Sequence, residues 1–135
     1  MSGTGKAVLI LVGSESDRAR IEPAFKVLDE AGVGYDFVVS SAHRQPDQTG
    51  ALVKGARGKG YRVLICGAGL AAALPGFAAS QTDLPVIGVP FDVGPLRGVD
   101  ALYAIAQLPS GVPVGTVGID NAKNAAHLAI RILKA

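Results

Sequence analysis

The segment SSAHRQP, residues 40–46, places a hydroxyl, an imidazole and a guanidinium within a few residues of each other. Arg44 could bind an anion through two parallel hydrogen bonds, and His43 could accept or release a proton near neutral pH. The segment follows an apolar run that is typical of a strand. We therefore interpret His43 and Arg44 as functional residues, whereas His127 lacks such neighbours and is assigned no function.

The segment GSESD, residues 13–17, joins an expected strand to the start of an expected helix. Free backbone amides at such a junction, together with the hydroxyls of Ser14 and Ser16, suit a phosphate group. Asp17 could accept hydrogen bonds from sugar hydroxyls. The same residue types are also the commonest helix caps, so ordinary capping by Ser16 or Asp17 is an alternative interpretation.

The segment GAGLAAALPG, residues 67–76, has glycines that let a ligand approach the backbone but no acid, base, nucleophile or hydroxyl. It matches G-x-G-x-x-A, a variant of the dinucleotide fingerprint, and Asp92 follows at about the required distance. A nicotinamide-dinucleotide-binding protein is therefore an alternative. Pro75 early in the helix, the position after the third strand and the short chain all weigh against it.

The composition is that of a folded, self-associating protein. The chain has 135 residues, of which 49% are hydrophobic and 18% are charged, and its formal net charge is +2. This length suits a single domain over residues 1–135. The apolar content is too high for a disordered chain and high for a small monomer. The small net charge and few aromatic residues give little support for nucleic-acid binding.

Other classes of site receive little support. The lone Cys66 excludes an internal disulfide and, because the start of the chain shows no secretory pattern, predicts a cytoplasmic protein. Cys66 ends an apolar run, so we interpret it as buried packing. The histidines and the cysteine lack the spacing of a metal site. A Ser–His–Asp triad stays open, although no serine lies in a G-x-S-x-G segment.

Short apolar runs alternate with helix-like stretches along the chain. We expect strands at residues 7–12, 35–40, 62–66, 85–91 and 113–119. We expect helices within residues 16–32, 46–60, 70–81, 98–107 and 121–135. This alternation predicts an α/β fold with a central parallel sheet of about five strands and helices on both faces. The charge-free stretch from residue 63 to 82 belongs to this pattern, because its glycines and proline argue against a membrane span.

Ligands of such sheets bind beyond the carboxyl ends of the strands. That rule indicates four loops, at residues 13–17, 40–46, 67–76 and 92–98. The residues alone therefore predict a small α/β protein that binds a phosphorylated sugar or nucleotide-like molecule. His43 would carry out proton transfer beside that molecule.

The sequence resembles the PurE family along nearly its whole length. The segments GSESD, VSSAHRQP, GAGLAAALPG, LPVIGVP, LPSGVPVGTVGI and NAKNAAHLA occur in the order and spacing of that family, from about residue 7 to 133. The family comprises the N5-carboxyaminoimidazole ribonucleotide mutases and the related aminoimidazole ribonucleotide carboxylases of purine synthesis. The resemblance implies a three-layer, flavodoxin-like fold and a homo-octamer whose active sites are shared between subunits.

The resemblance also implies the site. The substrate would be an imidazole ribonucleotide, CO₂ would pass between its nitrogen and its ring carbon C4, and neither a metal nor an organic cofactor would be needed. His43 would be the catalytic acid/base, and Asp17 would hold the ribose hydroxyls. The other substrate-binding residues implied by the resemblance are Ser14, Ser16, Ser41, Arg44, Gly67, Gly69 and Leu70.

The chain departs from the usual family pattern in one loop. Mutases of the family usually read G-A-G-G-A-A-H-L-P-G there, whereas this chain has Leu70 in place of a glycine and Ala73 in place of the histidine. The branch that uses free CO₂ also lacks this histidine but usually reads S-A-H-K in the earlier loop, where this chain has Arg44. We expect a mutase. A carboxylase or decarboxylase that uses free CO₂, and a PurE-like protein with another substrate or no activity, are alternatives.

Arg97 is a further candidate in this context. Its guanidinium could replace the imidazole that the family carries at residue 73. It is equally consistent with an ordinary solvated charge on the expected loop at residues 92–98.

Overall fold

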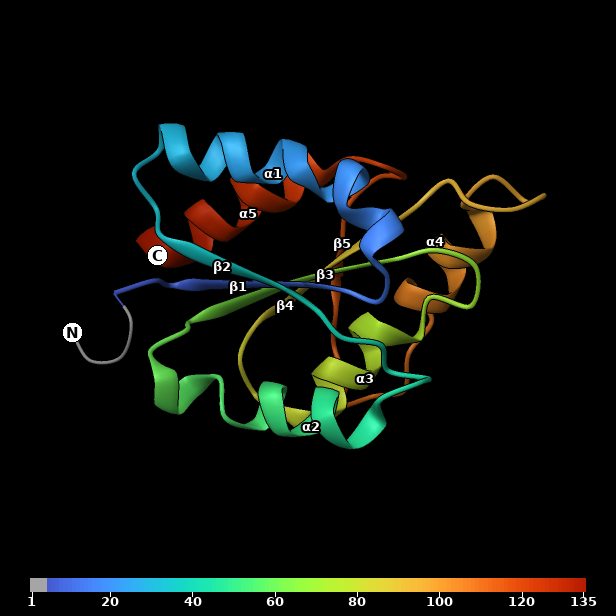
Figure 1. The fold of residues 1–135 in the computed structure, drawn as a ribbon, viewed down its shortest axis with the longest axis horizontal. Coiled ribbons are helices and arrows are strands. Elements are labelled where there is room, and N and C mark those ends of the chain that lie inside the picture. The colour runs from blue at the N-terminus through green and yellow to red at the C-terminus, as the bar shows by residue number, and fades with distance from the viewer. Residues whose placement is uncertain (1–4) are drawn as a thin grey trace.

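The structure, a computed structural model, describes residues 5–135. A single parallel sheet runs through its centre in the order β2-β1-β3-β4-β5 (Figure 1). The strands are β1 (Val8–Val12), β2 (Tyr35–Val39), β3 (Val63–Ala68), β4 (Val86–Pro90) and β5 (Gly115–Thr116). This is the strand order of flavodoxin-like folds, so the predicted fold class is confirmed.

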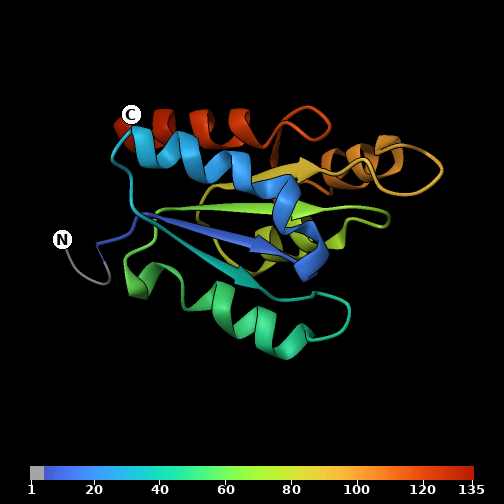
Figure 2. The same ribbon diagram turned by 45° about the horizontal axis from the view of Figure 1, so that its top comes forward.

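Helices cover both faces of the sheet, which makes three layers. Figures 1 and 2 show α1 and α5 side by side over one face and α2 and α3 over the opposite face. The helices are α1 (Arg18–Glu30), α2 (Pro46–Lys54), α3 (Ala73–Gln81), α4 (Val99–Ala106) and α5 (Ala122–Lys134), with short 3₁₀ turns η1 (Glu15–Asp17) and η2 (Arg57–Lys59). Within residues 5–135 no helix is long and apolar enough to cross a bilayer.

The continuous apolar run of β1 is explained by burial on both faces. Val8, Ile10 and Val12 pack in the core beneath α1 and α5, whereas Leu9 and Leu11 pack in the core shared with α2, α3 and α4. All five side chains are fully buried. Successive side chains of a strand point to opposite faces, so a central strand must be apolar at every position.

The buried interpretation of Cys66 is also confirmed. The residue lies in β3 and its side chain is fully buried. Burial raises the pKa of the thiol to about 12. At neutral pH the sulfur is therefore a protonated packing group and not a nucleophile.

Several predicted boundaries were wrong. The last strand spans only Gly115–Thr116 instead of residues 113–119, and it pairs with β4 alone at the edge of the sheet. The second helix ends at Lys54, and η2 follows in place of further helix. The third helix begins at Ala73 and not at residue 70, because Leu70 and Ala72 have φ angles of 46° and 47°. Left-handed residues cannot be part of a right-handed helix.

Of the two residues predicted to cap the first helix, Asp17 does occupy the N-cap position, but its side chain makes no capping bond. Ser14, and not Ser16 or Asp17, supplies the capping oxygen, which accepts a hydrogen bond from the Ser16 amide at 3.3 Å. That bond caps η1. The helix α1 starts at Arg18, and the side chain of its N-cap residue Asp17 makes no capping hydrogen bond. The Asp17 carboxylate is thus not used in capping.

Candidate functional site

A cleft of about 290 Å³ lies beyond the carboxyl ends of three neighbouring strands, β2, β1 and β3. Its lining comes from the loop after β1, the loop after β2 and the segment from the end of β3 into α3. The chain turns to opposite faces of the sheet after β1 and β3, because α1 and α3 cover different faces (Figure 1). Such a switch point leaves a crevice that no helix covers.

The cleft brings together most of the predicted site residues. Those among its lining residues are Ser14, Asp17, Ser41, His43, Arg44, Gly69 and Leu70. Ser16 is not among the lining residues, but its hydroxyl oxygen lies 2.9 Å from that of Ser14. Gly67 lies within β3 and is not among the lining residues, and none of the lining residues comes from the predicted loop at 92–98.

One wall of the cleft, formed by residues 13–17 and 41–44, is polar and internally hydrogen-bonded. The Ser41 hydroxyl oxygen accepts a hydrogen bond from the Arg44 amide at 3.1 Å. The Ser14 hydroxyl oxygen is held by the Ser16 amide and hydroxyl. His43 and Arg44 are exposed at the tip of their turn. This polar wall thus offers hydroxyls, an imidazole and a guanidinium to a ligand.

Asp17 is the acidic group of the polar wall. Partial burial raises the pKa of its carboxyl, and the positive charge of Arg20 acts in the opposite direction. A half-buried carboxylate that makes no capping bond is costly unless a ligand supplies donors. Sugar hydroxyls would be such donors.

The other part of the lining, residues 68–74, contains only alanine, glycine and leucine. We call it the apolar wall. It has no side-chain hydrogen-bonding group, and its shape is set by backbone conformation, with Leu70 and Ala72 both left-handed. A non-glycine residue in that conformation is strained by about 1–2 kcal/mol.

The glycines of this segment have a packing role. A Cβ atom on Gly67 would lie 2.3 Å from Cζ of Phe91, and one on Gly69 would lie 2.8 Å from Cγ2 of Val93. Both positions therefore exclude any side chain, because the segment that follows β4 packs against them. These glycines were predicted to allow a ligand to approach. Their packing role could not be predicted, because Phe91 and Val93 are distant from them in the chain.

Leu70 lies at the mouth of the cleft. It is among the lining residues, and its side chain is 52% exposed. Its Cδ2 atom occupies the space next to Gly94, where an added Cβ would come within 2.5 Å. Leu70 therefore connects the apolar wall to the 92–98 loop by van der Waals contact.

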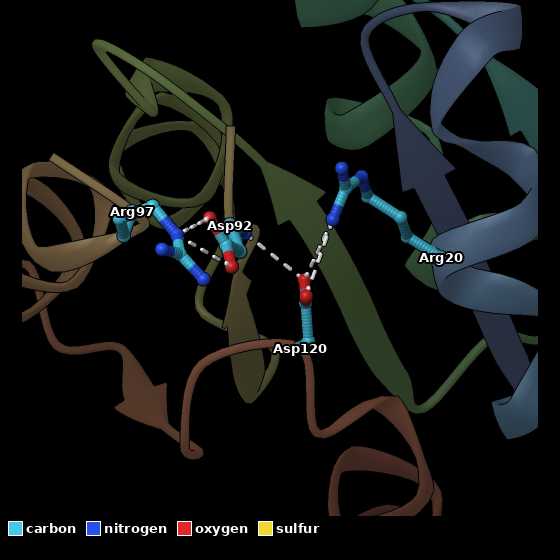
Figure 3. Close-up of polar contacts among 4 residues, drawn as sticks. All are labelled: Arg20, Asp92, Arg97 and Asp120. Atoms are coloured by element: carbon cyan, nitrogen blue, oxygen red, sulfur yellow. Dashed lines mark hydrogen bonds and ion pairs between the residues drawn. The ribbon is translucent and has the colours of Figure 1, made fainter. Parts of the chain in front are cut away.

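Arg97 does not reach the cleft. Figure 3 shows its guanidinium on the carboxylate of Asp92, with Nε 3.3 Å from Oδ1. The backbone amide of Asp92 in turn donates to Asp120, which also pairs with Arg20 at 3.2 Å. Arg97 is 79% exposed. The idea that it replaces the lost imidazole is therefore wrong for this structure, and Asp92, the expected ribose ligand of a nicotinamide cofactor, is engaged in an ion pair.

Two residues next to the polar wall were not predicted from the sequence. Ser40 and Thr49 are fully buried, and their hydroxyl oxygens lie 2.5 Å apart. Neither hydroxyl stands out in the sequence, because Ser40 ends an apolar run and Thr49 lies inside an expected helix. The signal that could have identified them is a hydroxyl residue at a position where the hydrophobic pattern predicts burial.

The comparisons with known proteins agree with this arrangement. The sequence model of the AIR carboxylase family matches residues 7–135. The chain is 52% identical over 124 residues to the N5-carboxyaminoimidazole ribonucleotide mutase of Pyrococcus horikoshii, which covers 92% of this chain and 70% of that protein. It is 50% identical over 124 residues to the phosphoribosylaminoimidazole carboxylase of Schizosaccharomyces pombe, where the match covers 92% of this chain and 22% of that protein.

A solved structure gives the same result for the fold. The crystal structure of Treponema denticola PurE superposes with a TM-score of 0.81 at 29% sequence identity. The superposition covers 96% of this chain and 80% of that one. The similarity therefore extends over the whole sheet and its helices and is not confined to the cleft.

Proposed function

The chain belongs to the AIR carboxylase family, and on that premise we propose that it is an N5-carboxyaminoimidazole ribonucleotide mutase of de novo purine biosynthesis. The carboxylate of the substrate moves from the exocyclic nitrogen to ring carbon C4, which gives 4-carboxyaminoimidazole ribonucleotide. The observation that carries the proposal is the meeting of His43 and Arg44 with Ser14 and Asp17 in one cleft beside an apolar wall.

The polar wall would bind the ribonucleotide. The Arg44 guanidinium suits a phosphate because it can donate two parallel hydrogen bonds. The hydroxyls of Ser14, Ser16 and Ser41 would complete the phosphate site, since a hydroxyl that accepts one bond keeps its own proton to donate. The Asp17 carboxylate would accept hydrogen bonds from the ribose.

His43 would move the proton. When the bond between the exocyclic nitrogen and the carboxylate breaks, its electron pair stays with the nitrogen and CO₂ is released. Ring carbon C4 then attacks CO₂, which forms the new carbon–carbon bond. His43 takes the proton from C4, and one proton is returned to the nitrogen, so the reaction is an isomerisation.

The apolar wall would retain the released CO₂. CO₂ has no net dipole and is poorly hydrated, and a segment made of alanine, glycine and leucine would keep water away from it. Holding CO₂ beside C4 replaces a bimolecular encounter with a reaction inside the cleft. Because residue 73 is an alanine and has no imidazole, CO₂ would be retained only by the shape of the apolar wall and by the exclusion of water.

A carboxylase that uses free CO₂ is the second candidate. It is favoured by Ala73, where the usual mutase pattern has a histidine. The chain is 50% identical to the Schizosaccharomyces pombe carboxylase and 52% identical to the Pyrococcus horikoshii mutase. Overall identity therefore does not distinguish the two donors. The distinction must be made by measurement.

The test compares two carboxyl donors. Purified protein receives N5-carboxyaminoimidazole ribonucleotide in one reaction, and aminoimidazole ribonucleotide with excess bicarbonate and CO₂ in another. We expect the C4-carboxylated product to form rapidly only in the first. Turnover only in the second would identify a direct carboxylase. If folded protein forms no product in either reaction, the changes at Leu70 and Ala73 would indicate a different substrate or a loss of activity.

We also propose that the protein works as a cytoplasmic homo-octamer. Support comes from large apolar side chains that remain exposed in the isolated chain, with Leu96, Val99 and Tyr103 at 60%, 42% and 63% exposure. A patch of this kind is typical of a surface that another subunit covers. Light scattering on the eluted protein measures its mass, and a monomer at micromolar concentration would contradict the octamer.

A further inference from the structure

One carbonyl oxygen closes the turn that carries His43 and Arg44. The Ser41 carbonyl accepts a hydrogen bond from the Gln45 amide at 2.9 Å. It accepts a second one from the Thr49 hydroxyl at 3.0 Å. The first bond closes the turn on itself, and the second ties its base to α2.

A second buried hydroxyl completes this arrangement. The Ser40 and Thr49 hydroxyl oxygens are 2.5 Å apart, and both residues are fully buried. Thr49 uses its only proton on the Ser41 carbonyl, so Ser40 must be the donor in the pair. A directed chain therefore runs from Ser40 through Thr49 to Ser41. The Ser40 amide is itself anchored on β1, through a 2.8 Å bond to the carbonyl of Val12.

We propose that Ser40 and Thr49 are positioning residues that hold the His43 turn in its productive orientation. The inference rests on the proposed function for what the turn does. Neither residue lines the cleft, so neither can contact the substrate. Two buried hydroxyls cost free energy relative to apolar side chains of equal size unless they are fully bonded. Here both hydroxyls are bonded, and the chain that they form ends on the Ser41 carbonyl at the base of the turn.

The first test is Thr49→Val, which keeps the shape of the side chain and removes the donor to Ser41. We expect kcat to fall about tenfold, because small misplacements of a catalytic group are enough for such losses. Thr49→Ser restores the hydroxyl and should recover most of kcat. A Thr49→Val enzyme with kcat within about twofold of the unmodified protein would overturn the proposal.

A matched control exists in β5. The hydroxyl of Thr116 is buried and has no hydrogen-bond partner among residues 5–135. Thr116→Val therefore makes the same chemical change at a buried site outside the chain of hydroxyls. It should leave kcat unchanged, and an equal loss in both variants would count against positioning.

The double variant Ser40→Ala with Thr49→Val separates positioning from stability. Thr49→Val alone leaves the Ser40 hydroxyl buried without an acceptor, which lowers the urea midpoint of unfolding. Removing the Ser40 hydroxyl as well should return the urea midpoint toward the value of the unmodified protein, because no buried hydroxyl is then left without a hydrogen-bond acceptor. The Ser41 carbonyl still lacks its second donor, so kcat should stay low. Recovery of kcat together with the midpoint would show a merely structural role.

Amide hydrogen exchange tests the inference without substrate. If the unmodified protein turns over neither donor, the proposed function fails, but the turn can still be observed. Thr49→Val should accelerate exchange of the Gln45 amide about tenfold while the amides of β1 keep their protection. An equal change in both places, or no change at Gln45, would overturn the positioning role.

Discussion

The polar and apolar walls of the cleft are held in place by different means. In the polar wall, the hydroxyl oxygens of Ser14 and Ser41 accept hydrogen bonds from the backbone amides of Ser16 and Arg44. The apolar wall has no such bonds and owes its shape to two left-handed residues and to glycines packed on Phe91 and Val93. The first wall is preorganised by hydrogen bonds, and the second by backbone conformation and close packing.

Because of this difference, substitutions in the polar wall should mainly change activity, and substitutions in the apolar wall should mainly change stability. A polar-wall residue such as His43 is exposed, so replacing it removes chemistry at little cost to folding. An apolar-wall residue such as Leu70 carries backbone strain, so replacing it changes folding first. Substitutions on the two walls should therefore affect different measurements.

His43→Asn should give the largest effect on activity. Without its acid/base group we expect kcat to fall by about 10²–10⁴-fold, the usual contribution of general acid–base catalysis. The free energy of unfolding should change by less than about 0.5 kcal/mol, because the side chain is exposed. Steady-state rates and urea unfolding measure the two quantities. His127→Asn is the matched control, and a His43→Asn enzyme with undiminished turnover would contradict the assignment of the polar wall.

Leu70 offers the corresponding test on the apolar wall. Leu70→Gly and Leu70→Ala both delete the contact with Gly94, but only glycine adopts a φ of 46° without strain. We therefore expect the glycine variant to be the more stable of the two by about 1 kcal/mol. Urea unfolding of the pair isolates the strain. Equal stability, or a more stable alanine variant, would mean that backbone conformation does not govern this wall.

Asp17→Asn should give the smallest effect, and one that depends on pH. Burial raises the pKa of the carboxyl in the folded protein, so the folded state binds the proton more tightly than the unfolded chain. The contribution of Asp17 to stability is thus fully present below the unfolded pKa of about 3.9 and is lost as pH rises through the folded pKa of this carboxyl.

The asparagine variant lacks this penalty. At pH 7 it should be the more stable protein by roughly 0.5 kcal/mol, a small difference because water screens a half-exposed carboxylate. At pH 3 the two proteins should unfold at the same urea concentration. Substrate binding should be weaker in the variant at neutral pH. A variant that is less stable at pH 7 would show that the Asp17 carboxylate is stabilised by a group of the protein itself and does not need a ligand.

Much of the fold was predictable because burial leaves a local record in the sequence. The apolar run at residues 7–12 marks a central strand, since both faces of β1 are covered. The same pattern correctly predicted the burial of Cys66. The order of strands and helices, with the rule for ligands at carboxyl ends, was enough to indicate three of the loops that line the cleft.

The tertiary structure decided what depends on segments that are distant in the chain. Gly67 must be bare because Phe91 packs on it, and Arg97 is directed away from the cleft because Asp92 holds it. The third helix starts late because Leu70 and Ala72 are left-handed, a conformation that residue type alone argues against.

The amino-acid pattern was thus enough to identify the buried apolar runs, three loops at the edge of the sheet and the side chains that could carry the chemistry. Only the tertiary structure decided how those side chains are held, as in the hydrogen-bonded chain from Ser40 through Thr49 to the Ser41 carbonyl. The physical reason is the separation along the chain of the residues that interact. Hydrophobic periodicity is written into consecutive residues, whereas a hydrogen bond between a strand end and a helix exists only once the two have packed together.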